Sequence, residues 1–234
     1  MWLVLAEDGD ESATWVAQQL QLRGLNPLRL VTGAELASSA RWCYRHDATG
    51  PRTELRLSDG VVVDSLAVRG VVNRLTGWYS APAPIAGTDI DYAAAEFAAL
   101  VLAFMNGLHC PVINRAEPTG AAGGPWSPLR WRWEAHLAGL TTYSSGHEAA
   151  IPPSPPGQFS TVLGLGGRLL GADDIDPSTA QGCSRLSKAR GDSLVQLSLR
   201  SDHGRPPAFA YATQLPDLWA WGQPAIDLIT EALR

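Results

Sequence analysis

The sequence predicts an α/β protein with a parallel sheet in its N-terminal part and an α+β arrangement in its C-terminal part. The first observation is a pair of β-branched runs, at residues 68–74 and 110–115, with a helical pattern over 91–106 between them. Two strands joined by one helix form a βαβ unit, so we expect parallel pairing and a right-handed crossover. The second observation is that the strand patterns after residue 158 follow one another through short turns, which is typical of antiparallel pairing.

The helical pattern over 91–106 has apolar side chains three and four positions apart, as on one buried helix face. Gly107 follows directly and is expected to end the helix. The apolar positions are Tyr92, Phe97, Leu100, Val101, Phe104 and Met105.

Both strands of the βαβ unit end in the same two residue types, Asn73 with Arg74 and Asn114 with Arg115. Ligands of open α/β sheets bind beyond the carboxyl ends of the strands. We therefore expect these four side chains at a binding crevice.

The remaining elements divide the chain into three predicted segments. Residues 1–118 form an α/β domain, 119–150 a connecting helix and loop, and 151–234 a reduced α+β domain. Within the last segment, Gly166 and Gly167 are expected to form a two-residue hairpin turn. A proline-rich stretch at 151–157 can be neither a helix nor a central strand.

Composition excludes several classes of protein. A hydrophobic content of 45% is typical of a globular protein, and a net charge of −5 gives no sign of nucleic-acid binding. No apolar run approaches the roughly 18 residues of a membrane span. The three cysteines lack CxxC spacing, which favours a reducing cytoplasm over a disulfide framework.

Local motifs give weak signals for known chemistries. The glycines at 120–124 match neither the P-loop nor the dinucleotide fingerprint, which favours a plain loop over a phosphate site. The histidines lack metal-site spacing, and no nucleophile elbow is present. Tryptophans alternate with arginines at 126–133, which is more typical of an amphipathic helix than of a base-stacking surface. That helix is expected to have one apolar face, made of Trp126, Leu129, Trp133, Leu137 and Leu140.

The order of these elements resembles that of the ATP-grasp ligases, in particular the RimK-like enzymes and the microviridin-type ribosomal-peptide maturases. The strand at 68–74 is similar to one in their N-terminal, pre-ATP-grasp domain, and the segment 92–114 to the helix and strand that follow. The hairpin at 161–171, the helix and strand at 182–199 and the end at 209–222 resemble their ATP-grasp domain. The resemblance covers nearly the whole chain and implies an N-terminal pre-ATP-grasp-like domain followed by a reduced ATP-grasp domain.

The chain departs from this family at the nucleotide site. The proline-rich stretch stands where the family has a subdomain that closes over ATP. By alignment at Pro216, the family's magnesium-binding Glu and Asn fall at Tyr211 and Thr213, and a preceding acidic residue falls at Ser198. Magnesium prefers charged oxygen ligands. The departures therefore imply that neither ATP nor magnesium binds and that no catalytic or metal-binding residue remains.

The resemblance and its departures predict a pseudoenzyme of peptide or natural-product modification, in the cytoplasm. Its expected partners are a full-length ATP-grasp enzyme, a second copy of itself or a precursor peptide, with neither nucleic acid nor membrane involved. Arg74, Arg115, Trp219 and Trp221 are the candidate binding residues, with Asn73 and Asn114 beside them. Two alternatives stay open. One is a homodimeric structural protein, and the other is a minimal ligase or transferase in which these arginines hold an anionic substrate and Glu96 or Glu117 acts as the base.

Overall fold

The computed structural model describes residues 1–39, 41–48, 50–77, 89–142, 158–201 and 207–234. They form two compact units, Met1–Gly124 with Asp217–Arg234, and Pro125–Pro216. The three segments drawn from the sequence remain a prediction as domains. Their last segment differs from the contact units, since the final helix packs within the first unit. The proline-rich stretch lies outside the described residues.

The first unit is built on a parallel sheet in the order β2-β1-β6-β7. Its strands are β1 (Trp2–Ala6), β2 (Leu28–Thr32), β6 (Gly70–Arg74) and β7 (Val112–Ile113). Helix α3 (Ile90–Asn106) connects β6 to β7, and the two strands pair in parallel. The predicted βαβ pairing is therefore confirmed, and the carboxyl ends of β1, β6 and β7 share one edge of the sheet.

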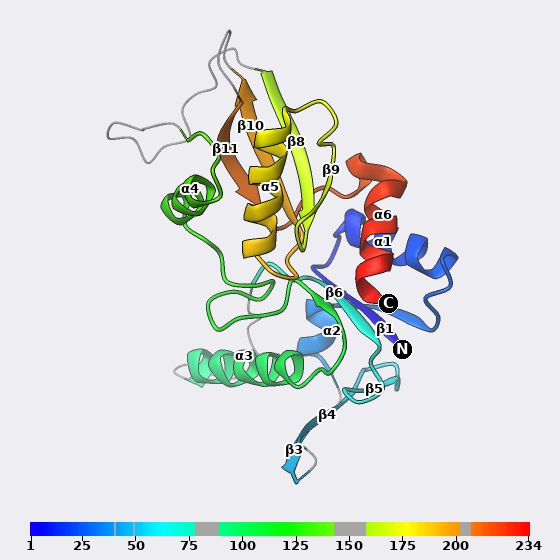
Figure 1. The fold of residues 1–234 in the computed structure, drawn as a ribbon. Helices are drawn as coiled ribbons and strands as arrows, with labels where there is room; N and C mark the ends of the chain where they lie inside the picture. Colours follow the sequence, from blue (N-terminus) through cyan, green and yellow to red (C-terminus); the bar gives the residue numbers. More distant parts are fainter. Residues whose placement is uncertain (40, 49, 78–88, 143–157, 202–206) are drawn as a thin grey trace. The chain divides into compact units, whose positions relative to one another are not determined.

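Helices cover both faces of this sheet (Figure 1). On one face α1 (Glu11–Leu22) lies beside α6 (Gly222–Leu233), and Arg23 joins the two helices through an ion pair of 2.8 Å with Asp227. The other face carries α3 and the short α2 (Gly33–Ala37), with a three-stranded meander beyond them. The meander consists of β3 (Arg41–Asp47), β4 (Gly50–Arg56) and β5 (Val62–Asp64).

Side chains alternate between these two faces along β1, as the pleat of a strand requires. Leu3 and Leu5 enter the core cluster that holds Phe104 and Met105 of α3. The opposite face of the sheet packs closely against α6. A Cβ atom on Gly70 of β6 would lie only 3.2 Å from the Leu233 side chain of α6. Since both faces are covered, β1 is buried at every position.

The second unit is an antiparallel sheet in the order β11-β10-β8-β9. Gly166 and Gly167 connect β8 to β9 with φ angles of 60° and 92°, and two positive angles in succession confirm the predicted hairpin turn. The strands are β8 (Gln158–Leu165), β9 (Arg168–Leu170), β10 (Val195–Ser201) and β11 (Ala208–Thr213), and the helices are α4 (Pro128–Leu137) and α5 (Pro177–Ala189).

Helix α4 turns a different side to the core than the sequence predicts. Trp131 is buried with Ala135, and its ring lies 4.7 Å from Trp126 and 6.4 Å from Phe209. The prediction of one buried apolar face is wrong for Leu129, Trp133 and Leu137, which are exposed. The reason is that α4 is apolar on two opposite sides, so spacing alone cannot decide which side is buried.

Cys183 on α5 is fully buried, and this burial raises the pKa of its thiol to about 11. Because the thiolate is the reactive form, we expect Cys183 to resist iodoacetamide at pH 8 in the folded protein and to react after unfolding in urea. Peptide mass mapping of the labelled protein would show this. Labelling of Cys183 without denaturant would contradict the buried position.

Asp176 caps α5 by accepting hydrogen bonds from Ser178 and Thr179, which lower the pKa of its carboxyl group to about 2. We expect Asp176→Ala to reduce the free energy of unfolding by about 1 kcal/mol at pH 7. A depressed folded-state pKa gives stability that is complete above the ordinary value of 3.8 and is lost as the pH falls toward 2. Urea titrations from pH 7 to pH 3 should therefore show the two proteins converging, whereas a constant difference would contradict the role of the carboxylate.

Among the residues that the structure describes, no helix is both long and apolar enough to cross a bilayer.

Candidate functional site

The two asparagines at the strand ends of the first unit connect the end of β6 to the segment that follows β7. The Asn73 side chain donates to the backbone oxygens of Asn114 and Ala121, at 2.9 and 2.6 Å. The Asn114 side chain donates back to the Asn73 oxygen at 2.9 Å, from a left-handed backbone with φ of 59°. Both residues are buried, so the geometry gives them a structural role at the predicted crevice.

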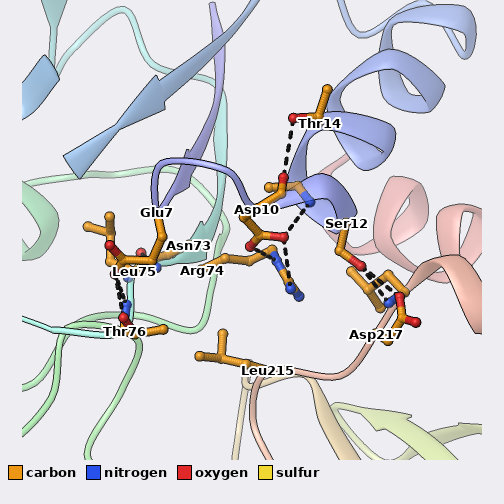
Figure 2. A network of polar contacts seen from close by, with 12 residues as sticks. Glu7, Asp10, Ser12, Thr14, Asn73, Arg74, Leu75, Thr76, Leu215 and Asp217 are labelled. Carbon is orange, nitrogen blue, oxygen red and sulfur yellow. Dashed lines mark hydrogen bonds and ion pairs between the residues drawn. The ribbon is translucent and has the colours of Figure 1, made fainter. Parts of the chain in front are cut away.

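Arg74 lies at the same edge and forms an ion pair with Asp10 (Figure 2). Its Nε lies 2.8 Å from Asp10 Oδ2, and one terminal nitrogen lies 3.3 Å from Oδ1. Asp10 is also the N-cap of α1 and accepts the Ala13 backbone N–H at 2.9 Å. The side chains of the pair are only 7% and 15% exposed, so Arg74 links the end of β6 to the start of α1.

Arg115 binds the backbone at the C-terminus of α3. Its guanidinium donates to the Met105 oxygen at 2.6 Å and to the Cys110 oxygen at 3.4 Å. A cation at a helix C-terminus is favourable, because the carbonyl groups there carry partial negative charge. The contact fixes the turn between α3 and β7.

Two further contacts complete the edge shown in Figure 2. Glu7 accepts hydrogen bonds from the backbone and the hydroxyl of Thr76, at 2.5 and 2.6 Å. Ser12 donates to Asp217 at 2.9 Å and accepts from the Leu218 backbone at 3.0 Å, which ties the last segment of the unit to α1. The polar side chains of this edge are thus engaged with one another and with the backbone.

An open hollow lies on the outer side of α1. It has a volume of about 310 Å³ and lies between one side of α1 and Trp219. Trp219 is 65% exposed, and its ring centre lies 5.4 Å from that of Trp15. The lining residues are Gly9, Glu11, Thr14, Trp15, Gln18 and Trp219. This hollow offers two aromatic rings and one carboxylate to a ligand, whereas Trp221 is half-buried and does not line it.

The three positions matched to magnesium ligands lie on β10 and β11 in the second unit. Ser198 is fully buried, and its hydroxyl has no hydrogen-bond partner. It stands opposite Tyr211, which is 51% exposed and has its ring 6.3 Å from that of Phe159. The Thr213 hydroxyl accepts the Leu215 backbone N–H at 3.2 Å. These neutral hydroxyls do not form the charged donor set that magnesium prefers.

The part of the chain that the structure describes contains no cluster of three or more His, Cys, Asp or Glu side chains that could hold a metal. The two carboxylates considered as a base, Glu96 on α3 and Glu117 after β7, are both exposed. Glu117 covers Gly124 so closely that a Cβ atom there would overlap its carboxylate. A side chain at Gly124 would therefore require the exposed carboxylate of Glu117 to move aside.

No protein-family model matches the sequence, and no curated protein sequence matches it. Solved structures match it over its whole length. The macrocyclase MdnC from Microcystis aeruginosa MRC, bound with precursor peptide MdnA, gives a TM-score of 0.71 at 9% identity and covers 100% of this chain and 97% of its own. The macrocyclase MdnB from the same organism gives 0.66 at 14%, covering 99% and 98%. The ATP-grasp ligase PsnB, complexed with a minimal precursor, Mg and ADP, gives 0.64 at 11%, covering 100% and 97%.

These structures correct the prediction that neither ATP nor magnesium binds. PsnB has been solved with Mg and ADP, and also with AMPPNP, so this fold is one that accommodates nucleotide and magnesium. The prediction is wrong because it treated a few aligned side chains and the proline-rich stretch as decisive for the whole fold. Ser198, Tyr211 and Thr213 show only that those three positions lack carboxylates.

Sequence reasoning singled out Trp219 but missed the partner of Arg74 and the other residues that line the hollow. Asp10 had a usable signal, because an aspartate directly before a helical pattern is a typical N-cap. Trp15 and Trp219 are 204 positions apart, and no local pattern could have joined them. The element order could be recognised, and the structural matches confirm it: this chain has the fold shared by the macrocyclases MdnB and MdnC and the ATP-grasp ligase PsnB.

Proposed function

We propose that this protein takes part in peptide modification as a peptide-binding subunit that does not itself catalyse ligation. The full-length likeness to ligases solved with precursor peptides supports a peptide ligand. The side-chain set of β10 and β11 carries the non-catalytic part. Ser198, Tyr211 and Thr213 place hydroxyls where the family's magnesium-binding carboxylate and amide groups are aligned, which supports a loss of phosphoryl transfer without excluding magnesium. The proposal concerns catalysis and leaves nucleotide binding to measurement.

The hollow on α1 is the proposed contact for one side chain of the peptide. Trp15 and Trp219 offer ring faces, and Glu11 offers an exposed carboxylate at the same place. An arginine or lysine side chain suits this combination, because it can stack on a ring while it pairs with the carboxylate. Of the residues singled out from the sequence, Trp219 is therefore the proposed binding residue, and Arg74 and Arg115 support the scaffold.

A complete ATP-grasp ligase is the proposed partner, with the cytoplasm as the proposed compartment. All three cysteines are free thiols, in keeping with a reducing environment. Size-exclusion chromatography of the chain alone, and together with any complete ligase found encoded beside its gene, would separate a mixed complex from a homodimer.

The decisive experiment is a turnover assay with any precursor peptide that is found encoded beside the gene, together with ATP and Mg²⁺. We expect the chain to bind the peptide and to release no ADP above the background without peptide. MdnC with MdnA is the positive control. Trp219→Ala should weaken binding, whereas Leu22→Ala, at another exposed apolar site, should not. Peptide-dependent ADP release by the pure chain would overturn the non-catalytic role.

A ligase function is the second candidate, favoured by the nucleotide and magnesium present in the PsnB structures. The same assay distinguishes it, because a ligase must turn over nucleotide as it joins its substrates. Loss of that turnover in Arg74→Ala, with folding retained, would favour the sequence-based hypothesis that Arg74 holds an anionic substrate.

A further inference from the structure

The outer face of the meander in the first unit carries four arginines. Trp42 and Leu55 lie directly opposite each other on the inner face, where Leu55 is buried and the Trp42 ring lies 6.1 Å from that of Phe104 on α3. Successive side chains of a strand point to opposite faces, so the neighbours of Trp42 and Leu55 point outward. We call the four exposed arginines on this outer face the arginine face, namely Arg41, Arg45, Arg52 and Arg56.

The strand register brings these arginines together in two rows. Arg41 of β3 lies directly opposite Arg56 of β4, and Arg45 lies directly opposite Arg52. Like charges directly opposite each other destabilise an antiparallel pair of strands. An anion bound to these rows would relieve the repulsion.

Most of this positive charge is not neutralised within the part of the chain that the structure describes. Arg52 forms an ion pair of 2.6 Å with Asp64. The other three arginines take part in no ion pair or hydrogen bond among the described residues. Residues 41–56 hold four arginines against one aspartate and one glutamate, which gives this segment a net charge of +2 in a chain of net charge −5. The arginine face is therefore a basic surface on an acidic protein.

Acidic side chains stand between the two basic rows. Glu54 of β4 lies opposite Asp64 of β5 on one side and opposite Cys43 of β3 on the other. Along the strands the face therefore changes from basic to acidic and back to basic. The two basic rows are four residues apart, which is about 13 Å along a strand. A single small anion is too short to contact both rows.

This pattern favours one kind of occupant. Nucleic acid has a continuous row of negative charges, which would meet the carboxylate of Glu54 as well as the arginines. An extended peptide with two carboxylates four residues apart has the same spacing of about 13 Å and leaves a neutral residue over Glu54. A second copy of the chain is disfavoured in any orientation, because each copy brings three unpaired arginines and only one unpaired glutamate.

We propose that the arginine face binds an extended acidic segment of the peptide ligand, with two carboxylates four residues apart. The inference rests on the proposed function, since it names the part of the ligand that the chain recognises. One carboxylate pairs with Arg41 and Arg56, and the other pairs with Arg45, because guanidinium groups bind carboxylates through two parallel hydrogen bonds. The site is separate from the hollow at Trp219, since α1 and the meander lie on opposite sides of the parallel sheet (Figure 1).

The test uses two short synthetic peptides of the same composition, each with two glutamates among threonines and serines. The glutamates are four residues apart in the first peptide. They are three residues apart in the second, which puts them on opposite sides of an extended chain. Fluorescence anisotropy with the full chain at low ionic strength should show saturable binding of the first peptide and about fivefold weaker binding of the second.

The double substitution Arg41→Gln with Arg56→Gln removes one basic row and should weaken binding of the first peptide about tenfold. The matched control is Arg130→Gln with Lys188→Gln, which removes the same charge at two exposed positions of the second unit and should bind as the wild type does. The test variant also loses a contact between like charges, so urea unfolding should show a stability no lower than that of the wild type.

Four results would overturn the inference: no saturable binding of the first peptide, equal binding of the two peptides, equal binding by the test variant and the wild type, or equal weakening in the control variant. A wild-type dimer that the test variant converts to a monomer would also overturn it, because a second copy would then occupy the arginine face. If any precursor found encoded beside the gene binds the wild type and the test variant equally, the arginine face fails as the peptide site while the proposed function stands. If the first peptide binds and that precursor does not, the proposed function fails while the arginine face stands as a site for spaced carboxylates.

Discussion

Arg74→Ala is expected to lower the free energy of unfolding by about 3 kcal/mol or more, because it leaves the buried carboxylate of Asp10 without its cation. Both side chains of this pair are at most 15% exposed, so water cannot replace the guanidinium well. Asp10 also caps α1, and the loss would reach the first turn of that helix. Urea titration followed by circular dichroism would measure the change.

Arg52→Ala is the matched control for this experiment. Arg52 forms an ion pair of 2.6 Å with Asp64, and its side chain is 49% exposed. Exposed pairs contribute about 1 kcal/mol at most, so this variant should stay close to the wild type. If Arg74→Ala were as stable as Arg52→Ala, the Arg74 guanidinium would be available to a ligand, as the sequence analysis expected.

Trp131→Ala should cause the other large loss, about 3 to 5 kcal/mol, whereas Trp133→Ala on the same helix should change stability by about 0.5 kcal/mol at most. Trp131 is 6% exposed and packs against Trp126 and Phe209. Trp133 is 62% exposed. The two substitutions have the same chemistry and the same helix propensity, so burial alone separates them.

The comparison has a clear contrary outcome. A larger loss for Trp133→Ala than for Trp131→Ala would restore the apolar face drawn from the sequence, with Leu129, Trp133 and Leu137 inside. Thermal unfolding of both variants in one buffer would suffice to rank them.

Those parts of the fold whose patterns are local could be predicted from the sequence. The strand–helix–strand unit β6-α3-β7 depends on runs of β-branched residues and on spacing within one helix, and it was confirmed. The hairpin at Gly166 and Gly167 depends on two adjacent residues and was confirmed too. The prediction of the buried side of α4 was wrong because the helix has two apolar sides. Only contacts with Trp126 and Phe209, which are tertiary neighbours, decide which side is buried.

The candidate site was harder to predict, because residue type does not reveal a partner far along the chain. Asn73 and Arg74 do stand at the carboxyl edge of the sheet, as the topology required. Their side chains, however, bind Asn114 and Asp10, which are 41 and 64 residues away. A polar pair at a strand end therefore indicates where the two side chains lie in the fold, but it does not show whether they contact a ligand.

The final helix completes the first unit although 92 residues of the second unit, 125–216, separate the two parts of the first unit in the chain. Ile226 and Ile229 of α6 are fully buried, and Arg23 and Gln19 at the C-terminal end of α1 bind Asp227 and Gln223 of α6. During synthesis on the ribosome, the face of the parallel sheet that α1 and α6 share must therefore wait with only α1 covering it until the second unit has been translated. That interval is when the nascent chain is most exposed to aggregation and to chaperone binding.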